Sequence, residues 1–205
     1  MTVPAAVAYV RDLLLGFGPP WYLCGGWAAD AWLGRQTRDH GDVDVAAFHA
    51  DQRAIYEYLS GWALVAHDPN VADDITDPWN GRRLDLPAHI HVLTPGSPLA
   101  TSATAHHAEF EFEFLLNERR GADWELDRAG VAIALDRCAR RPTWGLPTAP
   151  PEVVLFYKSV GGEPRPRDEQ DFLALLPILS GAQRSWLRDA VATVQPGHPW
   201  LARLG

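Results

Sequence analysis

The chain has 205 residues, 47% hydrophobic and 21% charged, which is the composition of a compact domain that buries its own core. A formal net charge of −8 argues against a nucleic-acid partner, which would need a basic face, and suits a cationic ligand. Apolar runs such as 153–157 are too short to span a bilayer, and residues 1–20 lack the order of a signal peptide, so we expect a cytoplasmic protein without a membrane partner.

Short strands and helices alternate along the first part of the chain. Apolar residues recur at helical spacing in residues 4–17, and the turn formers Gly18, Pro19 and Pro20 end that helix. In chain order the pattern predicts a strand at 21–24, a helix at 27–33 closed by Gly34, a strand at 43–48, a helix at 51–59 capped by Asp51, and strands at 62–66, 89–93 and 109–116.

The remaining segments are a polar loop and a helical end. Residues 67–81 are rich in turn formers and predict a surface loop or lid, in which Trp79 could stack on a ligand. After short strands and turns at 121–145, helices follow at 150–160, from Asp168 onward and at 182–194, with Asp168 and Asp171 as a capping pair. We predict an α+β fold with a core at 1–147 and a small C-terminal helical part at 148–205.

Gly25-Gly26 lies between a predicted strand and a predicted helix. Glycine permits a tight turn and lets the backbone come close to a bulky anion. The free N–H groups at the start of the helix that follows suit a phosphate. A pair of glycines before a helix is also common where the chain simply turns between two elements. By itself this feature is therefore compatible with a phosphate-binding turn and with a turn that binds no ligand.

Asp42 and Asp44 open the strand predicted at 43–48. Residues i and i+2 of a strand project on one face, so the two carboxylates would lie side by side. Like charges so close repel unless a cation lies between them, and Mg²⁺ prefers such oxygen ligands. The alternative is a solvated strand end, because aspartate is common in turns.

Together these two features resemble the aminoglycoside 2''-adenylyltransferase family, which belongs to the nucleotidyltransferases with a DNA polymerase β-like fold. The resemblance includes the segment 151–158 and the residues around 166–172, and it is weak over 67–108. It implies a mixed sheet with flanking helices and a helical C-terminal part. The residues that carry it are Gly25-Gly26-Trp27, Arg35, Thr37-Arg38, His40, Asp42-Val43-Asp44-Val45, Pro151 to Lys158, Pro166 to Glu169 and Asp171-Phe172.

The resemblance also implies a reaction. ATP would lie with its triphosphate over Gly25 and Gly26, and Asp42 and Asp44 would hold two Mg²⁺ ions. A hydroxyl of a small acceptor would attack the α-phosphorus in line and pyrophosphate would leave, with the metals stabilising the entering and leaving oxygens. The acceptor would be a cationic or hydroxylated small molecule, such as an aminoglycoside or lincosamide antibiotic, and the protein a monomer or homodimer.

The family places a third carboxylate, as metal ligand or base, on a later strand. Glu109, Glu111 and Glu113 alternate along the strand predicted at 109–116, and Asp85 lies on a possible earlier strand. Glu113 fits the related strand best and Glu111 is second. Because related enzymes often have aspartate here, whether a glutamate acts as base stays open, as does a plain wet strand face.

Basic residues offer further contacts to phosphate. Lys158 is the single lysine of the chain and matches a helix lysine of related proteins, where it would neutralise triphosphate charge. It could equally be an exposed helix lysine. Arg35 and Arg38 flank the loop before the aspartates and could bind phosphate, or form ion pairs with Asp30 or Asp39.

The other polar residues have simpler interpretations. We expect His40 to brace the loop before the metal strand, and Asp168, Glu169 and Asp171 to polarise a helix N-terminus, with a share in binding a cationic acceptor as the alternative. His89 and His91 alternate on a strand, but no further ligand completes a zinc site. Cys24 lies in an apolar run and is expected to be a buried hydrophobe.

Two other functions remain open at this stage. The same chemistry could modify a protein or an RNA end, although the net charge disfavours RNA. A nucleotide-binding module that has lost catalysis is the third possibility, against which the presence of both Asp42 and Asp44 argues.

Overall fold

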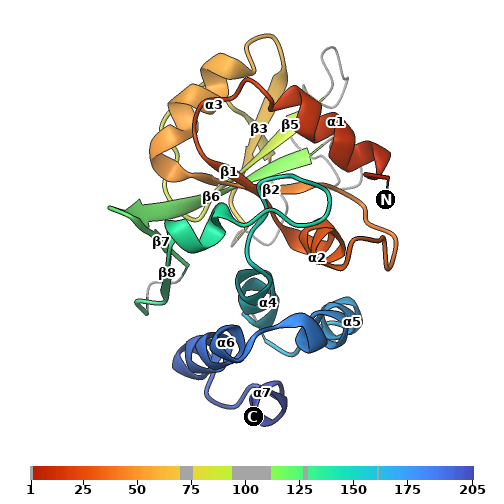
Figure 1. The fold of residues 1–205 in the computed structure, drawn as a ribbon. Helices are drawn as coiled ribbons and strands as arrows, with labels where there is room; N and C mark the ends of the chain where they lie inside the picture. Colours follow the sequence, from red (N-terminus) through yellow and green to blue (C-terminus); the bar gives the residue numbers. More distant parts are fainter. Residues whose placement is uncertain (1, 70–75, 94–111, 127–128, 161) are drawn as a thin grey trace.

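The computed structural model describes residues 2–69, 76–93, 112–126, 129–160 and 162–205, and it has an α+β fold (Figure 1). The strands are β1 (Trp21–Leu23), β2 (Asp44–Phe48), β3 (Ala63–His67), β4 (Thr76–Pro78), β5 (His89–Leu93), β6 (Phe112–Arg120), β7 (Asp123–Glu125) and β8 (Ala132–Ala134). The α-helices are α1 (Ala5–Leu13), α2 (Gly25–Leu33), α3 (Gln52–Tyr58), α4 (Pro151–Ser159), α5 (Pro166–Leu175), α6 (Gly181–Val194) and α7 (Leu201–Leu204).

The strands form one mixed sheet in the order β1-β2-β6-β5-β3-β4, with β7 pairing with both β6 and β8. β2 and β6 run parallel, and every other pairing among the described strands is antiparallel. The register places Asp44 opposite Glu113, near the starts of the two parallel strands. Since parallel strands begin at the same edge of a sheet, side chains from both starts meet there.

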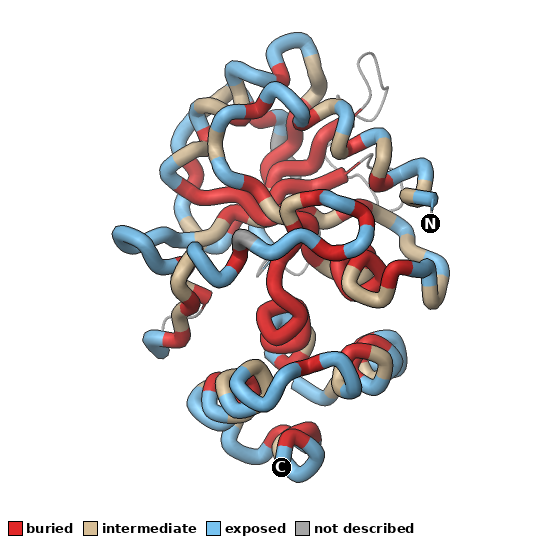
Figure 2. Tube along the Cα trace, viewed as in Figure 1, coloured by how far each residue is buried: buried red, intermediate tan, exposed pale blue. Residues whose placement is uncertain are grey.

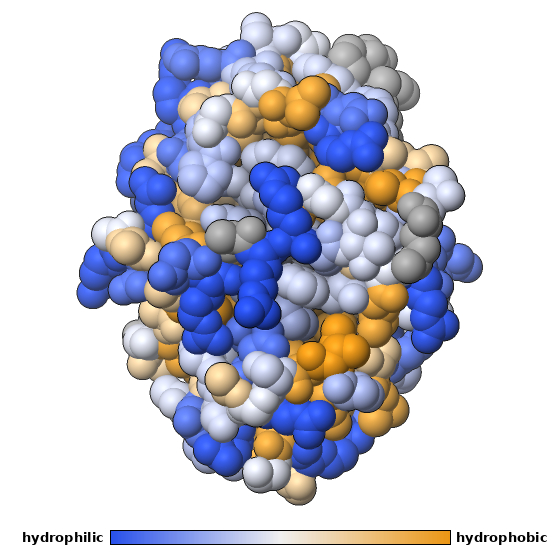
Figure 3. Space-filling view, viewed as in Figure 1, coloured by the Kyte–Doolittle hydropathy of each residue, from blue (hydrophilic) through white to orange (hydrophobic). Residues whose placement is uncertain are grey.

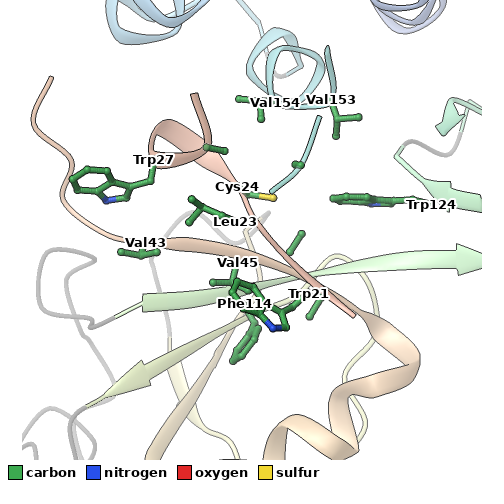
Figure 4. Packing of buried hydrophobic residues seen from close by; sticks show 14 of the residues in the cluster. Trp21, Leu23, Cys24, Trp27, Val43, Val45, Phe114, Trp124, Val153 and Val154 are labelled. Carbon is green, nitrogen blue, oxygen red and sulfur yellow. The ribbon is translucent and has the colours of Figure 1, made fainter. Parts of the chain in front are cut away.

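The C-terminal helices follow the last strand and lie together beyond α2, away from α1 and α3 (Figure 1). One hydrophobic cluster joins the sheet to these helices, so α4 is buried along most of its length, as Figure 2 shows. In Figure 4, Val153 and Val154 of α4 lie beside Cys24 and the loop that precedes α2. A division at residue 147 stays a prediction, although all residues after it that form regular structure are helical within the described part.

Several predicted helix ends differ from the structure. α2 starts at Gly25, so the glycine turn is itself the first turn of the helix, and Gly34 closes the helix with φ of 71° as expected. The prediction that Asp168 caps α5 is wrong: Arg165 occupies the N-cap position and Asp168 lies inside the first turn. The capping box was instead at α6, where Ser180 and Gln183 bind each other's backbone N–H groups.

The loop or lid predicted at 67–81 falls partly on residues 70–75, which lie outside the described residues, and its described part is not a loop throughout. It contains β4, which extends the sheet beyond β3. Trp79 is 4% exposed, donates a hydrogen bond from Nε1 to the carbonyl of Arg82 at 2.7 Å and packs edge-on against Tyr56. The idea that Trp79 stacks on a ligand is therefore wrong, because its ring belongs to the core.

The surface of the face drawn in Figure 3 is mainly hydrophilic, with hydrophobic residues in small separate groups. Among the helices of the described segments, none combines the length and the apolar character needed to span a bilayer. Cys24 and Cys138 are both buried free thiols, as expected for Cys24. Burial raises the pKa of Cys138 to about 12.

Candidate active site

Three carboxylates meet at the edge of the sheet where β2 and β6 begin. Asp42 precedes β2, Asp44 is its first residue and Glu113 is the second residue of β6. Their ligand atoms all lie within 4.8 Å of one another. Strand register brings Glu113 next to the two aspartates, and its role as their third metal ligand stays a prediction.

Burial and mutual repulsion perturb these carboxylates. Burial and the charges of Glu113 and Asp42 raise the pKa of Asp44 well above its ordinary value, while the ammonium of Lys158 acts in the opposite direction. Burial also acts to raise the pKa of Glu113, but the hydrogen bond with His89 and the nearby His91 outweigh it and lower that pKa to about 2. A cation between the three groups would remove the repulsion that keeps a proton on Asp44.

Histidines of β5 lie behind Glu113. His89 Nδ1 is 3.1 Å and His91 Nε2 is 3.6 Å from the same oxygen, Oε2 of Glu113. His89 is partly exposed and His91 is 1% exposed. The two histidines orient a carboxylate in place of forming a zinc centre: within the described segments, the single group of three possible metal ligands is Asp42, Asp44 and Glu113.

The glycine turn is packed closely between side chains of the site. Gly25 has φ of +61°, and a Cβ at this position would overlap with Oδ2 of Asp44. A Cβ on Gly26 would overlap with the guanidinium of Arg38 and the ring of His40. Glycine is therefore required at both positions, because side chains of the protein itself approach the backbone closely there. Asp44 lies against Gly25, and Arg38 and His40 lie against Gly26.

The loop between α2 and β2 is braced by a buried acid. Asp30 is fully buried and its Oδ1 accepts hydrogen bonds from the backbone and hydroxyl of Thr37, at 3.1 and 2.5 Å. Its Oδ2 lies 2.6 Å from Nε2 of His40, whose ring packs against Trp27 with centroids 4.2 Å apart. The bracing role expected for His40 agrees with these contacts.

A cluster of basic residues lines another wall of the site. Arg38 pairs with Asp171 through two hydrogen bonds, from Nε at 3.1 Å and Nη2 at 2.9 Å. Lys158 lies 2.7 Å from Asp171 and 3.2 Å from Asp168. Arg165 pairs with Asp168 at 2.5 Å. The expectation that Arg38 pairs with Asp30 or with the side chain of Asp39 is wrong, since the ion pair crosses to α5.

These two walls enclose a cleft of about 590 Å³. Acidic, basic and glycine residues from several stretches of the chain line it. A larger cavity of about 900 Å³ shares Cys24, His89, Leu115 and Tyr157 with it. The functional residues among the lining of the smaller cleft are Gly25, Gly26, Arg38, His40, Asp42, Asp44, His89, Glu113, Tyr157, Lys158, Arg165 and Arg167.

Other candidates from the sequence lie elsewhere. Arg35 is exposed at the end of α2 and is absent from the described lining of the cleft, so its proposed phosphate contact lacks support. Asp85 is exposed on an irregular segment and does not reach the three carboxylates. Glu109 and Glu111 lie outside the described residues. Lys158 faces the cleft with 9% of its side chain exposed, so it is not a solvated helix lysine.

The sequence reasoning missed four lining residues: Tyr157, Arg165, Arg167 and His89. Tyr157 and Arg167 lie inside segments that carry the family resemblance and Arg165 borders one of them, but none of the three was given a role in the site from the sequence. The concentration of charged residues over 165–171 was the available signal. It indicated a helix start because that is the commonest reason for acids in a first turn.

The three carboxylates have the chemistry of a divalent-metal site. Carboxylate oxygens are the hard ligands that Mg²⁺ prefers, and a site with three of them beside an open cleft leaves positions for phosphate and water. Their closeness and the raised pKa of Asp44 both indicate negative charge that a cation would balance. The residues present therefore fit a metal ion.

Comparison with known proteins agrees with the resemblance in the sequence. Residues 6–77 match the model of the aminoglycoside-2''-adenylyltransferase family, and no curated protein sequence matches the chain. The structure is similar to a lincosamide antibiotic adenylyltransferase with bound lincomycin, at TM-score 0.51 and 14% identity over 87% of this chain and 100% of that chain. It is also similar to ANT(2'')-Ia in complex with adenylyl-2''-tobramycin, at TM-score 0.47 and 14% identity over 90% and 94% of the two chains.

The first of these structural similarities confirms the predicted nucleotidyltransferase fold, because it extends over the whole length of the related chain. The family match covers the glycine turn and both aspartates, Asp42 and Asp44. Glu113 and Lys158 lie outside the matched segment. Their association with the site rests on the geometry described above.

Proposed function

From the premise that this chain resembles the aminoglycoside-2''-adenylyltransferase family over residues 6–77 and has the fold of an antibiotic nucleotidyltransferase, we propose that it transfers AMP from ATP to a hydroxyl of a small antibiotic-like acceptor. The observation that carries the proposal is the cleft with opposed charges. Three carboxylates lie within 4.8 Å of one another on one side, and the basic groups of Arg38 and Lys158 lie on another.

The basic groups and the glycine turn bind the triphosphate. Lys158 acts as a point charge and Arg38 presents a planar fork of donors to phosphate oxygens. Gly25 and Gly26 begin α2 and line the same cleft, and the free N–H groups of a first helical turn suit a phosphate. These contacts hold the leaving pyrophosphate and orient the α-phosphate, and positioning of this kind provides much of the rate in phosphoryl transfer.

Asp42, Asp44 and Glu113 would hold Mg²⁺. When bound, Mg²⁺ supplies positive charge at the reacting phosphate and lowers the cost of ionising the acceptor hydroxyl. A pKa of about 2 keeps Glu113 ionised, which supports its role as a ligand over a role as the base that takes the hydroxyl proton. The two histidines behind Glu113 fix the orientation of that carboxylate, as neighbours of metal ligands commonly do.

The larger cavity is the proposed acceptor site. It meets the cleft at His89, Leu115 and Tyr157, so an acceptor there could present a hydroxyl to the α-phosphate. Leu86, Pro87 and Leu126 give it apolar surface, and Asn117 and Glu118 give it polar groups. This mixture suits a hydroxylated molecule with apolar parts, and the family and fold similarities point to aminoglycosides and lincosamides. Because the reaction needs ATP, we expect it in the cytoplasm.

Release of pyrophosphate tests the proposal. The protein is incubated with Mg²⁺, ATP and a panel of aminoglycosides and lincosamides, and the products are analysed by mass spectrometry for the added mass of AMP. We expect pyrophosphate and an adenylylated product with at least one member. If no member of the panel gives pyrophosphate or an adenylylated product, the proposal of an antibiotic acceptor is wrong. ATP labelled at the α-phosphate, added to a cell lysate with the protein, would then reveal a modified protein or RNA.

Asp44→Asn is the variant that tests the metal site within the same assay. A matched control is Asp39→Asn, the same change at an exposed acid of the loop that precedes β2, which does not line the cleft. We expect the first variant to lose turnover and the second to keep it. Equal turnover in the two variants would contradict the proposed role of the carboxylates.

A further inference from the structure

Asp171 connects the two basic side chains that face the cleft. Its Oδ2 lies 2.9 Å from Nη2 of Arg38 and 2.7 Å from Nζ of Lys158, so one oxygen binds both cations. Asp171 belongs to α5, Lys158 to α4 and Arg38 to the loop between α2 and β2. Arg38 and Asp171 are 133 positions apart in the chain. A single carboxylate thus brings three distant segments together at one wall of the cleft.

Both cations keep hydrogen-bond donors beyond those that the acids take. The ammonium of Lys158 has three donors, and Asp168 and Asp171 account for two of them. The guanidinium of Arg38 has five, of which two bind Asp171 and one binds the carbonyl of Asp39. The remaining donors belong to side chains that line the cleft, where they are available to an anion.

Burial makes Asp171 a demanding choice for a structural position. Its side chain is 1% exposed, and burying a carboxylate is unfavourable unless charged partners compensate for its lost hydration. Asp171 does not cap α5, because Arg165 is the N-cap residue and Asp171 lies within the helix. The partners that compensate it are the two cations of the cleft wall, so the same contact that stabilises Asp171 also fixes their positions.

We propose that Asp171 is a positioning residue for the polyphosphate of the nucleotide, which holds Arg38 and Lys158 side by side so that their remaining donors converge on phosphate oxygens. This proposal rests on the function proposed above. Asp168 also helps to hold Lys158 in position, and it pairs with Arg165. Asp171 is absent from the lining of the cleft and acts through the two cations.

Two explanations of the role of Asp171, one from its charge and one from the geometry of its contacts, predict opposite effects of its replacement on anion binding. If only the sum of charges mattered, removing a negative charge beside two cations would strengthen binding of an anion. If the arrangement of the cations matters, the same change would release both side chains and weaken binding, because the ordering of long side chains would have to be provided by the ligand. The sign of the effect therefore separates the two explanations.

The test is binding of Mg²⁺-tripolyphosphate and of Mg²⁺-ATP by calorimetry to the wild type and to Asp171→Asn. Tripolyphosphate has no base or sugar, so it reports the phosphate contacts directly. We expect Asp171→Asn to bind both ligands about tenfold more weakly or worse, the size of a lost charge-assisted hydrogen bond. Binding that is unchanged or tighter would overturn the proposal.

Glu152→Gln is the matched control. Glu152 is a buried acid of α4 that pairs with Arg137 at 2.8 Å and does not line the cleft. We expect it to lose stability like Asp171→Asn and to bind both ligands like the wild type. If both variants weaken binding equally, the effect is general loss of structure and the proposal is wrong. A wild type that binds neither ligand would refute the proposed function itself.

Arg38→Lys keeps the test decisive if Asp171→Asn does not fold. It preserves the positive charge but removes the two-donor fork that binds Asp171. We expect at least threefold weaker binding of Mg²⁺-tripolyphosphate, whereas the same change at Arg53, an exposed residue of α3 paired with Glu57, should have no effect. Binding of Arg38→Lys equal to that of the wild type would overturn the proposal.

Discussion

Replacing Asp44 by asparagine removes one charge from the group of three carboxylates and leaves the size of the side chain unchanged. The ligand oxygens of the group lie within 4.8 Å of one another. At such a separation and an effective dielectric constant of about 20, each ionised pair repels by about 3 kcal/mol. The protein without metal should therefore not be destabilised by Asp44→Asn.

Asp44 repels both Glu113 and Asp42, and the nearby ammonium of Lys158 offsets part of that repulsion, so the expected gain in stability lies between zero and about 3 kcal/mol. The lower end applies because burial and the charges of Glu113 and Asp42 raise the pKa of Asp44, so a proton already relieves part of the repulsion. For a chain of this length, the upper end corresponds to a rise in Tm of roughly 10 °C. Wild type should gain stability on addition of Mg²⁺, because a ligand that binds the native state shifts unfolding by mass action, and the variant should gain much less.

Turnover should change in the opposite direction. Loss of a metal ligand removes charge stabilisation worth several kcal/mol in the transition state, which corresponds to a fall in kcat on the order of a thousandfold. Thermal unfolding with and without Mg²⁺ and pyrophosphate release are measured on the same preparations, with Asp39→Asn as control. Either unchanged turnover in Asp44→Asn or a loss of more than about 1 kcal/mol of metal-free stability would refute the reasoning.

Three further predictions concern the same site. Affinity for Mg²⁺, measured by calorimetry, should rise with pH, because the metal must displace the proton that Asp44 holds through its raised pKa. In the metal-free protein, protonation of Asp44 contributes stability. This contribution is complete below the ordinary pKa of 3.8 and is lost as pH rises through the native pKa. An affinity independent of pH would contradict this. Gly25→Ala should cost about 1–3 kcal/mol in chemical denaturation through its positive φ and its overlap with Asp44, whereas Gly18→Ala, which has open space, should cost little. His89→Ala should weaken Mg²⁺ binding about tenfold by freeing the carboxylate of Glu113, and His89→Asn, which retains a donor, should restore most of it; equal losses would count against an orienting role.

Local patterns in the sequence were sufficient to predict the glycine turn, the pairing of Asp42 with Asp44 on one strand face, and most of the helices and strands around them. Alternation along a strand depends on a period of two residues, which is independent of the rest of the fold. The same local reasoning misassigned Trp79, because a tryptophan among turn formers looks exposed, whereas its ring is buried against Tyr56 of α3. It also misassigned Asp168 and Asp171, because acids in a first helical turn are usually explained by the helix dipole.

The sequence by itself determined which chemical groups this protein has available and which of them lie on one face of one strand. It could not determine that Glu113 lies opposite Asp44, since that depends on the register of two parallel strands. Nor could it determine that Asp171 joins Arg38 to Lys158, since the ion pair spans 133 positions. Contacts between distant segments are set by how the hydrophobic faces of α4, α5 and the sheet pack, and only the tertiary structure decides that packing.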